Sequence, residues 1–279
     1  MSRPLRIGHL YPDAMNIYGD VGNVRTLVQR ARWRGIDVEV LAIGPGPAEL
    51  AEYDLLFMGG GQDRDQSRIF GDFTEHKGSA MEHALEDGVA VLAVCGGYQL
   101  LGESYVDADG HELTGLGLLD LRSSAGHDRW IGNVVIEADA SLQLQPRTVV
   151  GFENHGGRTR LGAGLHPLGR VVVGGGNNGE DGGEGVVRGR LIGTYLHGSL
   201  LPKNPHLADW LLATALAHRD AAGLVAALSP LDDSVEMAAH SRALELAMAE
   251  RGRRAVPLRG RGAPAADGRR GWLPYNPHP

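Results

Sequence analysis

The first hundred residues alternate between short apolar runs and amphipathic stretches. Two stretches carry apolar residues at spacings of three and four, which predicts helices over Val21–Trp33 and Ser79–Glu86. The intervening apolar runs predict strands over Leu5–Tyr11, Ile36–Ile43, Tyr53–Met58 and Val89–Val94. Strands that alternate with helices and are apolar along their whole length are typical of a parallel sheet covered on both faces. The pattern therefore predicts an α/β fold.

After residue 101 the predicted elements become shorter and richer in strand, separated by loops of Gly, Asn and Asp. The predicted strands are Trp130–Glu137, Thr148–Phe152, Arg170–Val173 and Gly185–Leu196. Two further helices are predicted over Pro205–His218 and Ser234–Ala249. We divide the chain into one large domain over 1–220, a helical extension over 221–250 and a tail over 251–279.

Charge separates that tail from the rest of the chain. The formal charge is −7, but the residues from Arg251 onward contribute seven Arg and one Asp, a charge of +6, and leave −13 on the first 250. The tail is also rich in Pro and Gly, so we expect it to be disordered or to dock onto a partner.

The acidic charge of the first 250 residues argues against a nucleic-acid partner. No apolar run approaches the roughly 20 residues of a membrane span, and a single cysteine excludes an intrachain disulfide. We expect a cytoplasmic protein.

The single cysteine stands in an informative context. The apolar run Val89–Val94 leads directly into Cys95, then Gly96 and Gly97, and then an apolar helical start. A strand that ends in a nucleophile and a glycine turn resembles a nucleophile elbow, although Ala93 replaces the first glycine of that pattern. A lone cysteine is often only a small buried apolar residue, but this context favours a nucleophile.

A cysteine nucleophile needs a base, and His197 is the best placed of the twelve histidines. It follows the apolar run Val186–Leu196, and in a doubly wound sheet the chemistry gathers at the carboxyl ends of the strands. His155, in Asn-His-Gly, is the alternative base. We interpret the following histidines as surface or hydrogen-bonded core residues: His76, His83, His206, His218 and His240.

A glycine run, Gly59–Gly61, follows the predicted strand Tyr53–Met58. Its backbone N–H groups, together with that of Gly96, are candidates for an oxyanion hole. The chain lacks the Gly-Lys-Ser/Thr sequence of a phosphate-binding loop, and no Cys/His cluster indicates a metal site. We therefore expect acyl transfer without nucleotide, cofactor or metal on this chain.

These motifs resemble the class I glutamine amidotransferases, specifically the cobyric-acid-synthase-like branch. The stretches Tyr11–Asn23, Gly151–Gly157, Gly176–Asp181 and Gly193–Pro205 are closer still to the GatD branch, the glutaminase subunits of lipid II isoglutaminyl synthases. The resemblance covers residues 5–220 and excludes the tail. It implies a flavodoxin-like domain with a mostly parallel central sheet flanked by helices.

The resemblance also implies roles for individual residues. Cys95 would attack the side-chain amide of glutamine, with His197 as base and then acid, and with Gly60 and Gly96 as oxyanion donors. Gln99 would contact the substrate, and Arg129 would bind its α-carboxylate, although sequence alone favours a surface charge at Arg129. Most class I enzymes carry an acid two residues after the histidine, where this chain has Ser199. Either a dyad suffices, or an acid from elsewhere orients His197.

The implied partner is an ATP-dependent Mur-ligase-like subunit (MurT), which would hold ATP and Mg²⁺ and amidate the D-glutamate α-carboxyl of lipid II in a heterodimer. Three alternatives stay open at this point. The chain could serve another synthetase of the cobyric-acid type, act as a non-catalytic scaffold of the same fold, or hydrolyse an unrelated substrate.

Overall fold

The computed structural model describes residues 3–16, 19–61, 63–197, 200–220 and 227–254. Its centre is a six-stranded sheet in the order β11-β12-β4-β3-β1-β2. The strands are β1 (Leu5–Leu10), β2 (Val38–Ile43), β3 (Leu55–Met58), β4 (Ala90–Val94), β11 (Val186–Arg188) and β12 (Leu191–Thr194). All neighbours are parallel except β11, which pairs antiparallel with β12 at one edge.

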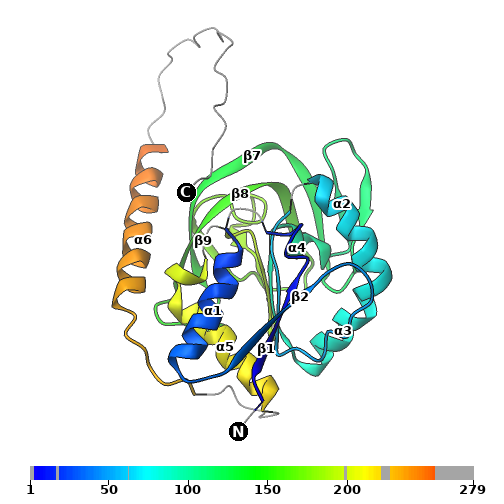
Figure 1. Cartoon of the computed structure of the whole chain (residues 1–279). Coiled ribbons are helices and arrows are strands. Elements are labelled where there is room, and N and C mark those ends of the chain that lie inside the picture. Colours follow the sequence, from blue (N-terminus) through cyan, green and yellow to red (C-terminus); the bar gives the residue numbers. More distant parts are fainter. Residues whose placement is uncertain (1–2, 17–18, 62, 198–199, 221–226, 255–279) are drawn as a thin grey trace, which may run out of the picture.

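Helices cover both faces of this sheet, as the apolar strands require. Every residue of β3 and of β4 is buried, so neither strand has a solvent face. In Figure 1, α1 (Val21–Trp33) and α5 (Pro205–Arg219) lie on one side of the strands, and α2 (Asp63–Asp72) and α3 (Gly78–Asp87) lie on the other. A single π-helical turn, η1 (Phe73–Lys77), joins α2 to α3.

A second six-stranded sheet lies beside the first and follows the order β10-β9-β7-β5-β6, with β8 paired to β7. Its strands are β5 (Ser104–Val106), β6 (Glu112–Thr114), β7 (Leu121–Ala138), β8 (Thr148–Leu161), β9 (Gly169–Val173) and β10 (Gly183–Glu184). The long β7 and β8 form an antiparallel pair whose register breaks between Ala125 and Trp130. This irregularity turns a segment of β7 away from the regular ladder, and Arg129 lies in it.

The C-terminal helix α6 (Ser234–Arg254) packs on the second sheet and stands apart from the central layers in Figure 1. Its Ala247 joins a small apolar cluster with Val135 and Val150. The segment before it is held by Arg30, whose buried guanidinium bonds Asp209 at 2.7 Å and Asp233 at 2.6 Å. None of the described helices has the length and apolar character that would let it cross a membrane.

Most elements predicted from the apolar pattern are confirmed, including the bounds of α1. The short predicted strands Trp130–Glu137 and Thr148–Phe152 are wrong in their bounds, because they are parts of the long β7 and β8. The predicted single strand Gly185–Leu196 is also wrong, because it is the hairpin of β11 and β12. The polar interruption at Arg188 and Arg190 supplies the turn, and Gly189 between them has φ of 58°, a conformation that glycine tolerates. The strongly polar helix α2 was not predicted, because it offers too few apolar positions to show a period. The predicted tail lies outside the described residues beyond residue 254.

Candidate active site

Four adjacent strands of the central sheet direct their carboxyl ends to one edge. In sheet order these are β12, β4, β3 and β1. The residues that follow them are His197 after β12, Cys95 after β4, Gly60 after β3, and Asp20 at the end of the longer loop after β1. Parallel pairing thus gathers four residues that are far apart in the sequence.

Cys95 occupies a strained backbone conformation between β4 and the short helix α4 (Gly96–Leu100). Its φ of 52° and ψ of −106° are unfavourable for a residue with a Cβ atom. The backbone holds this geometry at both ends, because the N–H of Cys95 donates to Thr194 O at 2.8 Å and its carbonyl accepts the N–H of Gln99 at 2.9 Å. The side chain is 7% exposed. This is the geometry of a nucleophile elbow, which holds the sulfur at the edge of the sheet.

His197 is fully buried beside Cys95 and is anchored by a backbone hydrogen bond from its N–H to Phe152 O at 2.8 Å. Burial lowers the pKa of its imidazole, but the charge of Cys95 and hydrogen bonds to Asp20 and Cys95 oppose this effect and raise the pKa to about 10. The imidazolium is therefore favoured at neutral pH. A cysteine with an imidazolium beside it is the arrangement of a Cys–His nucleophile pair.

The completely buried carboxylate of Asp20 lies against the imidazole of His197 and is the candidate acid that orients it. Its Oδ1 lies 3.2 Å from His197 Nδ1. Asp20 precedes α1 at the N-cap position but makes no side-chain cap there. Asn16 Oδ1 instead accepts the N–H of Val21 at 2.9 Å, which leaves the Asp20 side chain available for the site.

The second oxygen of Asp20 contacts the predicted oxyanion loop. Asp20 Oδ2 accepts the N–H of Gly60 at 2.8 Å, and the N–H of Gly97 donates to Gly59 O at 3.3 Å. In this conformation the Gly60 N–H points to Asp20, so its service as an oxyanion donor requires that hydrogen bond to be shared or released. The predicted role of Gly60 and Gly96 remains a prediction.

Gln99 belongs to a buried chain of hydrogen bonds behind the elbow. Its Nε2 donates to Tyr195 Oη at 2.9 Å, and Tyr195 Oη lies 2.6 Å from Thr159 Oγ1. Thr159 Oγ1 in turn lies 2.7 Å from Ser123 Oγ. This chain connects α4 to the strands of the second sheet, so Gln99 holds the elbow against Tyr195. Its predicted contact with substrate stays a prediction.

Glu184 forms hydrogen bonds with the end of β12 and with the residue that follows it. Its buried carboxylate accepts the N–H of Tyr195 at 2.7 Å and the hydroxyl of Thr194 at 3.0 Å. Burial raises the pKa of Glu184 to about 7, although these hydrogen bonds and the charge of His197 act in the opposite direction.

Arg129 is exposed and projects from the irregular part of β7. Its Nη1 donates to the backbone and side-chain oxygens of Asn154, each at 3.1 Å. It lines a cavity of about 420 Å³ together with Trp130, Glu153 and Gly175. Its predicted contact with a substrate carboxylate stays a prediction.

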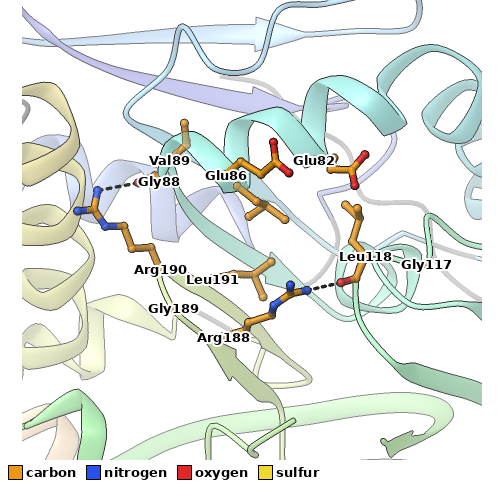
Figure 2. A pocket seen from close by; sticks show the side chains of 11 residues that line it. Glu82, Glu86, Gly88, Val89, Gly117, Leu118, Arg188, Gly189, Arg190 and Leu191 are labelled. Carbon is orange, nitrogen blue, oxygen red and sulfur yellow. Dashed lines mark hydrogen bonds between the residues drawn. The ribbon is translucent and has the colours of Figure 1, made fainter. Parts of the chain in front are cut away.

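A larger cavity of about 550 Å³ lies at the opposite end of the central sheet (Figure 2). Glu82 and Glu86 of α3 lie on one side of it, and Arg188 and Arg190 flank the turn between β11 and β12. It lies at the amino ends of β4 and β12, whereas Cys95 follows the carboxyl end of β4. This cavity is therefore separate from the candidate active site.

His155 and the five histidines that we interpreted as surface or hydrogen-bonded core residues make other contacts. His155 stacks on Tyr195 with ring centroids 3.9 Å apart, and its Nδ1 lies 2.8 Å from Gly157 O. Because Nδ1 is used in this hydrogen bond, it is not available for the role of base that we considered for His155. The five histidines that we interpreted as structural are exposed or hydrogen-bonded, namely His76, His83, His206, His218 and His240.

Sequence reasoning missed Asp20. An aspartate directly before a helix is normally interpreted as its N-cap, which hides any other role. The signal that points elsewhere is Asn16, a second capping residue in the same loop. Ser199, where most class I enzymes have their acid, lies outside the described residues.

Comparison with known proteins identifies the family. The model of the CobB/CobQ-like glutamine amidotransferase domain family matches residues 6–205. A glutamine amidotransferase from Thermotoga maritima shares the fold with a TM-score of 0.50 at 14% identity, covering 90% of this chain and 94% of that chain. Fold, site and family model together define a CobB/CobQ-like glutamine amidotransferase.

Two curated relatives narrow the assignment. The "Lipid II isoglutaminyl synthase (glutamine-hydrolyzing) subunit GatD" of Staphylococcus aureus is 44% identical over 212 residues, which is 76% of this chain and 84% of that subunit. The subunit of the same name from Streptococcus pneumoniae is 42% identical over 215 residues, which is 76% of this chain and 80% of that subunit. Cobyric acid synthases match at lower identity. The chain belongs to the GatD family.

Replacing Asp20 tests its role in orienting His197. We expect Asp20→Asn to lower kcat for glutamine hydrolysis by about 100-fold, because the amide cannot accept from both His197 and Gly60 or stabilise the imidazolium by charge. The pKa of His197 should fall, so the alkaline limb of the kcat/KM profile should move to lower pH. Asp13→Asn changes an exposed carboxylate in the same loop and is the matched control. A wild-type kcat in Asp20→Asn would contradict the assignment.

Glu184 should make stability depend on pH. Its pKa of about 7 is above the ordinary value of 4.5, so the folded state binds this proton more tightly than the unfolded state. The resulting stabilisation is fully present below pH 4.5 and is lost as the pH rises through 7. Glu184→Gln keeps a neutral side chain throughout.

The free energy of unfolding of Glu184→Gln, relative to wild type, should therefore rise by up to about 3 kcal/mol between pH 5 and pH 8. Denaturant unfolding at both pH values measures this difference, with the exposed Glu180→Gln as control. If the free energies of unfolding of wild type and Glu184→Gln differ by the same amount at pH 5 and at pH 8, the raised pKa of Glu184 is contradicted.

Proposed function

We propose that this chain hydrolyses L-glutamine through a thioester on Cys95 and supplies the ammonia to a separate synthetase subunit. The observation that carries the proposal is the buried arrangement of Cys95, His197 and Asp20 at one edge of the sheet, in a chain of the GatD family. Nucleophile, proton carrier and orienting acid are the parts that amide hydrolysis through an acyl-enzyme requires.

In the proposed reaction the Cys95 thiolate attacks the side-chain carbonyl carbon of glutamine. The carbonyl oxygen becomes an oxyanion, for which Gly96 and a released Gly60 N–H are the candidate donors. Collapse of the intermediate breaks the C–N bond, and the proton on Nε2 of His197 goes to the leaving nitrogen, which departs as ammonia. His197 then takes a proton from water as the water attacks the thioester, and glutamate leaves with Cys95 restored.

The proposed acceptor of the ammonia is the D-glutamate α-carboxyl group of lipid II. Support comes from the two relatives, which are named subunits of lipid II isoglutaminyl synthase and which this chain spans over 84% and 80% of their lengths. A carboxylate must be activated before ammonia can attack it, and this sequence contains no phosphate-binding loop. We therefore infer an ATP-dependent, Mur-ligase-like partner (MurT) that holds ATP and Mg²⁺, with the assembly at work in the cytoplasm.

The first experiment tests glutamine hydrolysis without reference to the acceptor of the ammonia. Ammonia release from L-glutamine is measured for the full chain, alone and co-expressed with a Mur-ligase-like subunit, beside Cys95→Ala. We expect the wild type to release ammonia and Cys95→Ala to lose at least about 1,000-fold in rate while keeping its cooperative unfolding, since the nucleophile is lost but little volume changes. The absence of release by wild type with its partner would contradict the glutaminase.

The second step identifies the acceptor. The complex is given ATP, glutamine and either lipid II or a corrin carboxylate, and amidated product is measured by mass spectrometry. We expect amidation of lipid II only. Amidation of the corrin acceptor alone would assign the chain to a cobyric-acid-type synthetase instead.

A further inference from the structure

The cavity beside Arg129 contains charges of both signs. Arg129 presents an exposed guanidinium to it from β7, and Glu153 presents a carboxylate from the neighbouring strand β8. Trp130 forms part of the wall between them. A cavity with one cation and one anion suits a small zwitterion such as a free amino acid.

Glu153 is held in place but keeps capacity for another donor. Its side chain is almost completely buried, and both carboxylate oxygens accept the N–H of Gly175, at 3.0 and 3.1 Å. A carboxylate has about four acceptor positions, so one backbone N–H leaves most of them available. A buried carboxylate is costly unless further donors or a positive charge reach it, and the charge of Arg158 interacts with Glu153 from the neighbouring part of β8.

His155 adds a second acceptor next to this carboxylate. Its Nδ1 lies 2.8 Å from the carbonyl of Gly157, which can only accept, so Nδ1 carries a proton, and Nε2 is an acceptor whenever it carries none. That Nε2 is buried and makes no hydrogen bond within the described part of the chain. It lies 3.7 Å from Glu153 Oε2, too far for a direct hydrogen bond. A carboxylate and a ring nitrogen that lie this close without a direct hydrogen bond can both bind a group that carries several N–H donors.

The strand that carries these two residues contacts the segment that ends in His197. Phe152, the residue before Glu153, accepts the backbone N–H of His197 at 2.8 Å. The ring of His155 stacks on Tyr195, two residues before His197, with the planes 8° apart. A ligand bound between Arg129 and Glu153 is therefore beside the strand that delivers His197.

We propose that Glu153, assisted by Nε2 of His155, binds the α-ammonium group of the glutamine substrate, opposite Arg129 at its α-carboxylate. The inference rests on the proposed glutaminase function and assigns the specificity of that site for a free α-amino acid. An ammonium group supplies three N–H donors and a positive charge, which satisfy both acceptors and offset the burial of Glu153. Glutamine residues within a peptide lack both charged groups and are rejected by the same site.

The wild-type enzyme provides a test that does not depend on any variant. Ammonia release by the full chain with its synthetase partner is compared for L-glutamine and for glutaramate, which has the same amide and carboxylate but no amino group. We expect KM for glutaramate to be about 10- to 100-fold higher, because the charge-assisted hydrogen bonds are lost. Equal KM values for both substrates would overturn the proposal while leaving the glutaminase intact.

The variant Glu153→Gln tests whether this side chain causes the difference in KM between the two substrates. Its amide oxygen can still accept the N–H of Gly175, so the contact with the backbone is kept. We expect KM for L-glutamine to rise about 10- to 100-fold with kcat within a few-fold of wild type, and KM for glutaramate to stay unchanged. Glu137→Gln, on the distant end of β7, is the matched control. Equal losses for both substrates would mean that Glu153 is structural and would overturn the proposal. No release from either substrate by wild type would instead contradict the glutaminase.

Discussion

The buried carboxylate of Asp20 connects the side chain of His197 to the backbone of the glycine loop after β3. One oxygen bonds the imidazole of His197 and the other bonds the N–H of Gly60, so the loop after β1, the loop after β3 and the residue after β12 share one hydrogen-bonded centre. Such a carboxylate is stable in the interior because both of its oxygens have donors. The raised pKa of His197 follows from it and from the neighbouring Cys95. The nucleophile, the base and the candidate oxyanion loop therefore depend on one another.

The arrangement also explains how strain at Cys95 is maintained. A positive φ at a non-glycine residue persists only where the surroundings hold it. Here the parallel ladder of β4 and β12 fixes the N–H of Cys95, and α4 fixes its carbonyl. The second sheet contributes the hydrogen-bonded chain through Tyr195 and the cavity wall near Arg129. The central sheet thus positions the chemistry, and the second sheet shapes the space in which we propose that the substrate binds.

The parallel fold and the Cys95–His197 pair could be predicted from the sequence because each is a local signal: apolar strands, and strand ends marked by a nucleophile or base and by glycine. Asp20 could not, because its role depends on a loop that brings a helix cap position next to a strand about 180 residues away. Glu153 and His155 were missed as a pair for a related reason. The strand period puts both on one face of β8, but only the tertiary structure shows that both are buried and that Nε2 of His155 makes no hydrogen bond within the described residues.

The most direct measurement is covalent labelling with a glutamine analogue that carries an electrophilic diazoketone in place of the carboxamide. The account predicts one label per chain, located on Cys95 by peptide mass spectrometry, suppressed by L-glutamine and slowed in Asp20→Asn. Labelling at another residue, or labelling of Cys95 at a rate that neither glutamine nor the loss of Asp20 changes, would contradict the assignment of Cys95 as the glutamine-directed nucleophile.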